Sequence, residues 1–182
     1  MLTKIFFGIL IISLCVSCKT NLLIDESSKE IIPYKGTEKL QFVSNDNDTL
    51  NIYLVGIGSK IKDLNVEGQQ YSYEQKLYHS NTIDGLVELT FVALSASPEG
   101  DIFVLNIFNK GHYVFEKEIL ISKLTDAGTK NYVNKNIVYK DVFSIPRTTD
   151  LKQEYYIREC YWSKSKGLIA FKENSGRTWN IK

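Results

Sequence analysis

The chain has 182 residues, of which 22 are Lys or Arg and 21 are Asp or Glu, so its formal net charge is +1. Hydrophobic residues make up 43% of the chain, and its length suits one domain with a packed core. Because it has neither a basic stripe nor a polybasic segment, the charge pattern argues against nucleic acid as a partner and against electrostatic capture by an anionic membrane.

The N-terminus has the order of a secretory signal peptide. Lys4 precedes an apolar run from Ile5 to Ile12, and the uncharged stretch continues to Ser17. That stretch is shorter than the about 20 residues that a helix needs to span a bilayer. We therefore expect residues 1–17 to be a signal peptide. The alternative, a buried N-terminal helix, lacks an amphipathic period and a capping residue.

The apolar run ends in Leu14-Cys15-Val16-Ser17-Cys18. This ending resembles the lipobox of bacterial lipoproteins, with Ser17 as the small residue before cleavage and Cys18 as the lipid attachment point. The resemblance implies a mature protein that begins at Cys18, carries acyl chains such as palmitate and is anchored to the cell outer membrane. Cys15 stands where leucine is usual, as in the relaxed lipoboxes of the Bacteroidota, and cleavage at Cys15 is the alternative.

Residues 18–33 are expected to be the lipidated cysteine and a flexible tether that ends at Pro33. The segment has few aromatic residues and no clear strand alternation. Fully extended, residues 19–33 would span at most about 50 Å, which would let the domain clear the membrane. The signal for surface export in the Bacteroidota places acidic residues directly after the cysteine, whereas Asp25-Glu26 comes late here. We therefore expect the periplasmic face rather than the cell surface.

Residues 34–182 are predicted to be a single all-β domain of about nine antiparallel strands, folded as a sandwich or as a curved, partly closed sheet. The prediction rests on β-branched and aromatic runs separated by turn clusters. A polar loop is expected over residues 122–136, and an ordinary turn at Gly56–Lys60. The strands are expected at Lys39–Val43, Thr49–Val55, Tyr71–His79, Leu86–Leu94, Ile102–Phe108, Tyr113–Ile121, Ile137–Ile145, Glu154–Trp162, Leu168–Lys172 and Thr178–Ile181. Among these, Leu86–Leu94 and the two strands after it form an antiparallel meander, the best candidate for the core.

The C-terminal part resembles small uncharacterised β-rich lipoproteins of the Bacteroidota. The matching residues are Trp162-Ser163-Lys164, Gly167-Leu168-Ile169, Phe171, Gly176 and Trp179, with a weaker match at Ile32-Pro33-Tyr34-Lys35-Gly36. The resemblance implies a β-sheet lipoprotein and brings no known activity.

The sequence contains no motif that identifies a reaction, a cofactor or a metal site. Gly56-Ile57-Gly58 lacks the third glycine of a dinucleotide fingerprint. Cys160 lies in an apolar stretch and is interpreted as a small buried hydrophobe; as a nucleophile it would need a basic partner. His112 is interpreted as a surface residue at a turn, and it could be a general base only beside a carboxylate such as Asp101 or Glu116.

Aromatic residues are the one enrichment that suggests binding. They could form a platform that stacks against a sugar or peptide, or they could fill the core. The candidate ligand-facing residues are Tyr71, Tyr73, Tyr155, Tyr161, Trp162 and Trp179. In addition, Asp48-Thr49-Leu50 resembles the acceptor of protein O-glycosylation in the Bacteroidota.

The leading hypothesis is a non-catalytic envelope module that binds a protein, a glycan or a lipid. Two alternatives stay open. One is an envelope hydrolase or redox enzyme that uses Cys160 or His112, and the other is a lipid carrier with an apolar cavity.

Overall fold

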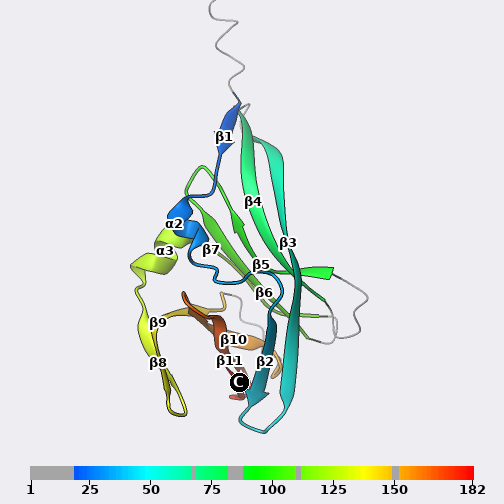
Figure 1. Cartoon of the computed structure of the whole chain (residues 1–182), viewed down its shortest axis with the longest axis vertical. Coiled ribbons are helices and arrows are strands. Elements are labelled where there is room, and N and C mark those ends of the chain that lie inside the picture. Colours follow the sequence, from blue (N-terminus) through cyan, green and yellow to red (C-terminus); the bar gives the residue numbers. More distant parts are fainter. Residues whose placement is uncertain (1–18, 67–68, 82–87, 110–111, 149–151) are drawn as a thin grey trace, which may run out of the picture.

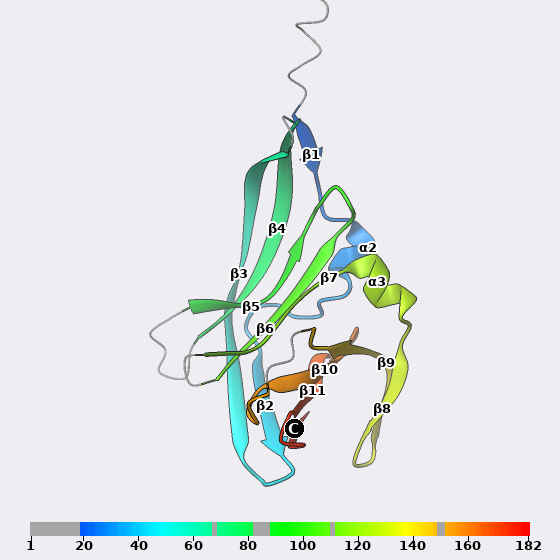
Figure 2. The same ribbon diagram turned by 180° about the vertical axis from the view of Figure 1, so that it is seen from behind.

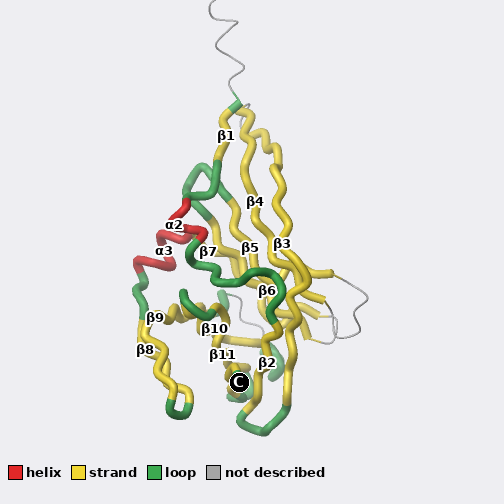
Figure 3. The backbone as a smooth tube through the Cα atoms, in the orientation of Figure 1, coloured by secondary structure: helices red, strands yellow, loops and turns green. Residues whose placement is uncertain are grey.

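The computed structural model describes residues 19–66, 69–81, 88–109, 112–148 and 152–182. Over these residues the chain forms one curled sheet of twelve strands, accompanied by two short helices (Figures 1 and 3). The strand order is β7-β6-β5-β4-β3-β2-β12-β11-β10-β9-β8, and β1 pairs with β4. The neighbours along this order are antiparallel and β1 is parallel to β4. The predicted all-β class and the curved sheet are confirmed.

The strands are β1 (Thr20–Leu22), β2 (Lys39–Ser44), β3 (Thr49–Val66), β4 (Gln69–Asn81), β5 (Glu88–Ser95), β6 (Ile102–Asn109), β7 (His112–Leu120), β8 (Lys130–Asn134), β9 (Ile137–Pro146), β10 (Ile157–Ser163), β11 (Gly167–Glu173) and β12 (Thr178–Ile181). The helices are α2 (Glu26–Lys29) and α3 (Ile121–Asp126). The predicted β2–β3 hairpin and the β5–β6–β7 meander are both present.

The core lies in the concavity of the sheet, between its β3–β7 half and its β9–β12 half (Figure 2). Trp162 on β10 is completely buried, and its ring lies 4.9 Å from that of Phe103 on β6. The two halves therefore share one hydrophobic core, as expected for a single domain.

The N-terminal segment differs from the predicted flexible tether. It contains β1 and α2, and Ile24, Ile31 and Ile32 are all buried in the core. The Trp162 indole N–H donates a hydrogen bond of 2.9 Å to the carbonyl of Ile31. The apolar residues of this segment follow neither the period of a strand nor that of a helix, so their pattern predicts no regular element. In the structure they fill the gap between the two halves of the sheet.

Residues 121–136 also differ from the predicted polar loop. Ile121 and Leu124 of α3 are buried, and β8 pairs with β9 across a turn in which Lys135 has a φ of 52°. Most side chains of β8 are exposed, so the strand lacks the alternation by which strands are recognised. The sheet therefore has twelve strands where about nine are predicted, and β1 and β8 are the two with no counterpart among the predicted ranges.

The turn expected at Gly56–Lys60 is instead part of β3. Gly56 pairs with His79 and Gly58 with Leu77, after a bulge between Leu54 and Gly56. The β3–β4 pair is therefore one long ribbon that runs beyond the core to the end of the molecule where β1 joins it (Figure 1).

We predict that Tyr34→Phe will lower the free energy of unfolding by about 1–3 kcal/mol, because the backbone N–H of Leu168, which donates a 2.7 Å bond to Tyr34 Oη, would be left buried without an acceptor. Urea unfolding measures this. The exposed Tyr53 provides the matched control, and Tyr53→Phe should be close to neutral. Equal losses of stability in Tyr34→Phe and Tyr53→Phe would contradict a stabilising role for the hydrogen bond from Leu168 to Tyr34.

Candidate functional site

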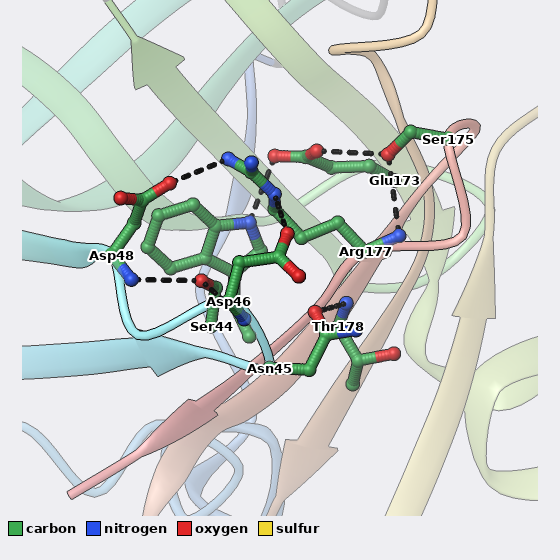
Figure 4. Close-up of polar contacts among 9 residues, drawn as sticks. Ser44, Asn45, Asp46, Asp48, Glu173, Ser175, Arg177 and Thr178 are labelled. Carbon is green, nitrogen blue, oxygen red and sulfur yellow. Dashed lines mark hydrogen bonds and ion pairs between the residues drawn. The ribbon is translucent and has the colours of Figure 1, made fainter.

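Two turns that are distant in sequence lie side by side at one end of the sheet (Figure 4). The β2–β3 turn contacts the β11–β12 turn through Asn45, whose N–H donates to the carbonyl of Thr178 at 3.0 Å. The segment before β10 joins them, because the Ser175 N–H donates to the carbonyl of Glu154 at 3.0 Å. The three segments surround an open hollow of about 470 Å³, which is lined by Asn45, Asp46, Glu154, Tyr155, Glu173, Ser175, Gly176 and Arg177.

The β2–β3 turn is shaped by its own side chains. Ser44 Oγ accepts hydrogen bonds from the backbone N–H groups of Asp46 and Asp48, at 3.2 and 3.0 Å. Asn47 has a φ of 67°, a left-handed conformation that asparagine tolerates better than most residues. The turn is therefore held in one geometry with both aspartates directed toward Arg177.

Arg177 is shared between two carboxylates (Figure 4). Its Nε lies 2.8 Å from Asp46 Oδ2, and a terminal nitrogen lies 2.9 Å from Asp48 Oδ2. The guanidinium also lies over the ring of Trp179, at 5.8 Å from its centroid. Because two aspartates offset its charge, Arg177 joins the turns and does not make the hollow an anion site.

Glu173 is buried beneath the hollow, and both of its carboxylate oxygens accept hydrogen bonds. Its Oε1 accepts a 2.8 Å hydrogen bond from the indole N–H of Trp179, and its Oε2 accepts one of 3.2 Å from Ser175 Oγ. Of the charged residues lining the hollow, Asp46, Glu154 and Glu173 are acidic and Arg177 is basic. The arrangement suits a ligand that donates hydrogen bonds or carries positive charge.

The candidate aromatic residues do not form one platform. Trp162 and Trp179 are buried in the core, so the prediction that they face a ligand is wrong and they fill the core instead. Tyr71 and Tyr73 lie on β4 opposite Leu64 and Lys62, at the other end of the molecule (Figure 1). Only Tyr155, which is 48% exposed, lines the hollow.

Tyr161 belongs to a separate polar cluster on the outer face of β10. Its hydroxyl donates a 2.6 Å hydrogen bond to Glu159, which also accepts one from Ser144 Oγ, and its ring lies 4.6 Å from that of Tyr132. Burial acts to raise the pKa of Glu159, but these two hydrogen bonds, together with the charges of Lys172 and Arg158, outweigh it and hold the pKa below its usual value. The same burial and the carboxylate raise the pKa of Tyr161. These contacts occupy Tyr161 within the fold.

Of the two residues of the enzymatic alternative, Cys160 and His112, the structure describes only the side chain of Cys160. Cys160 is completely buried, and burial raises the pKa of its thiol well above its ordinary value, so its interpretation as a small hydrophobe is confirmed. His112 is the first residue of β7 and pairs with Asn109; its side chain lies outside the described structure. Cys18 and the predicted signal peptide, residues 1–17, also lie outside the described residues.

Within the described ranges, no group of three or more His, Cys, Asp or Glu side chains could hold a metal ion. No helix in that part of the chain is long and apolar enough to cross a membrane. Comparisons with protein-family models, curated proteins and solved structures find no match to this chain.

Sequence reasoning identified both turns but not the site that they make. Asp46 and Arg177 are 131 positions apart, and their pairing depends on the antiparallel contact of β12 with β2. Thr49, of the glycosylation-like Asp48-Thr49-Leu50, is exposed at the start of β3 beside this site.

We predict that Glu173→Ala will lower the free energy of unfolding by about 1–3 kcal/mol, because the indole N–H of Trp179 would be buried without an acceptor. Glu173→Gln keeps an acceptor oxygen and should cost less. Glu154→Ala, at an exposed position of the same hollow, should change stability by no more than about 0.5 kcal/mol. Urea unfolding, monitored by tryptophan fluorescence, measures the free energy of unfolding of the three variants. Similar losses of stability in all three would contradict the role of Glu173.

Proposed function

We propose that this protein is an envelope lipoprotein, anchored through Cys18 to the outer membrane on its periplasmic side, whose β domain is a non-catalytic binding module. The ligand site is the hollow between the β2–β3 and β11–β12 turns, and its ligand is a glycan. The observation that carries the proposal is a solvent-open hollow of about 470 Å³ whose polar groups are held by interlocked turns beside the exposed ring of Tyr155.

The chemistry of the hollow favours a glycan over a lipid. Carboxylate, amide and hydroxyl groups line it, and a sugar can donate hydroxyl hydrogens to the carboxylates while its apolar face stacks on tyrosine. An acyl chain would leave those groups without partners. The enclosed apolar space beside Trp179 measures only about 10 Å³, which does not support the lipid-carrier alternative.

The acidic excess gives a second candidate, a basic segment of a protein partner. Glu154 is exposed and lines the hollow, so its carboxylate can approach a lysine or arginine of such a partner. The two candidates differ in what they require. A glycan depends on the Tyr155 ring, whereas a basic peptide depends on the charge of Glu154.

Binding of an N-acetylglucosamine tetramer, measured by calorimetry, tests the proposal. Tyr155→Ala should weaken it about fivefold, because the lost stacking contributes about 1 kcal/mol. Tyr53→Ala removes a similarly exposed tyrosine outside the hollow and should leave the affinity unchanged.

The same titration with tetralysine separates the two candidates. Binding of tetralysine alone, lost in Glu154→Gln, would favour the basic partner. No binding of either probe, or equal weakening by the Tyr155 and Tyr53 changes, would contradict the proposed site.

A further inference from the structure

Exposed apolar side chains gather at the end of the molecule where the described chain begins. Leu23 is 69% exposed and Ile61 70%, and both line an open hollow of about 560 Å³ between β1 and the β3–β4 ribbon. Single exposed apolar residues are ordinary, but two that face one hollow expose a shared apolar surface. We call residues 19–23, 60–65 and 70–73 the ribbon tip.

Each face of the tip exposes at least one apolar side chain among polar ones. Ile61 lies opposite Glu74, whereas Leu64, which is 45% exposed, lies opposite Tyr71. Successive residues of a strand point to opposite faces, so Leu64 and Tyr71 lie on the face away from Ile61. A flat partner surface would cover only one face of the tip and leave the other exposed to water. Immersion of the tip in lipid would cover both faces.

The charges of the tip are compatible with a lipid headgroup region. Lys19 and Asp63 form an ion pair of 2.9 Å, while Lys60 and Lys62 are exposed on the same face of the ribbon as Leu64. Lysines near a bilayer surface are attracted to anionic lipids, and tyrosines such as Tyr71 favour the interface between headgroups and acyl chains.

The place of Cys18 in the sequence indicates that the partner of the tip is a membrane. Lys19 lies at the tip, and a single peptide unit, about 3.8 Å between Cα atoms, joins it to the proposed lipid attachment point Cys18. Since residues 19–34 are folded into the domain, no free tether separates an acylated Cys18 from the ribbon.

We propose that the ribbon tip docks into the lipid interface of the membrane that holds Cys18, with Leu23, Ile61 and Leu64 as its apolar contacts. This inference rests on the proposed lipid anchor and adds an orientation to it. The β3–β4 ribbon stands on the bilayer, and the β2–β3 turn, at the opposite end of the ribbon, points away from it (Figures 1 and 2). The candidate ligand site is then presented to the periplasm.

The test uses the full mature protein purified from membranes, with its acylation established by intact mass. Ile61→Cys provides a labelling site for an environment-sensitive fluorophore, while the buried Cys160 stays unlabelled. The matched control is Val133→Cys on β8, an apolar position that is 62% exposed and lies far from the tip (Figure 1). Both proteins are placed in phosphatidylcholine–phosphatidylglycerol vesicles that contain a doxyl-labelled quencher lipid.

We expect the label at position 61 to shift its emission to the blue and to be quenched severalfold more than the label at position 133. Water-like, equally unquenched labels on an acylated, vesicle-bound protein would overturn the docking and leave the anchor standing. A blue shift at 61 that depends on protein concentration and not on quencher lipid would assign the tip to a second copy and also overturn it. Protein that carries no acyl chain and does not float with vesicles would overturn the anchor itself.

Discussion

The fold depends on burial of the segment that precedes the first long strand. Two hydrogen bonds tie this segment to the opposite half of the sheet, one from the Trp162 indole to the carbonyl of Ile31 and one from the Leu168 N–H to Tyr34 Oη. Gly167, with a φ of 78°, lies so close to Tyr34 that any Cβ at this position would overlap the ring. The curled sheet alone would leave its concave face open, so the N-terminal segment completes the core.

Burial of the N-terminal segment also bears on the proposed orientation of the domain relative to the membrane. A tethered domain could turn freely above a membrane, but a domain that is folded from Lys19, directly after the proposed anchor at Cys18, cannot. The exposed tip of the β3–β4 ribbon and the polar hollow lie at opposite ends of the elongated molecule. In the proposed orientation the first contacts lipid and the second faces a ligand.

The sequence predicted the parts of the fold that depend on local pattern. Apolar runs such as Ile102–Phe108, bounded by turn residues, gave the meander, and the Ser44–Asp48 cluster gave a hairpin turn. Residues that are stabilised only by distant contacts were missed, including Ile31 under Trp162 and the exposed strand β8. The candidate site was not predictable for the same reason, because the ion pair of Asp46 with Arg177 needs the β2–β12 contact.

The measurement that tests the account most directly is intact mass spectrometry of the protein from its native membrane fraction, compared with a Cys18→Ala variant. The account predicts a wild-type chain that begins at an acylated Cys18 and a variant that is unprocessed or lacks the lipid mass. A wild-type chain that keeps residues 1–17, or that begins elsewhere without lipid, would contradict the anchor and the orientation derived from it.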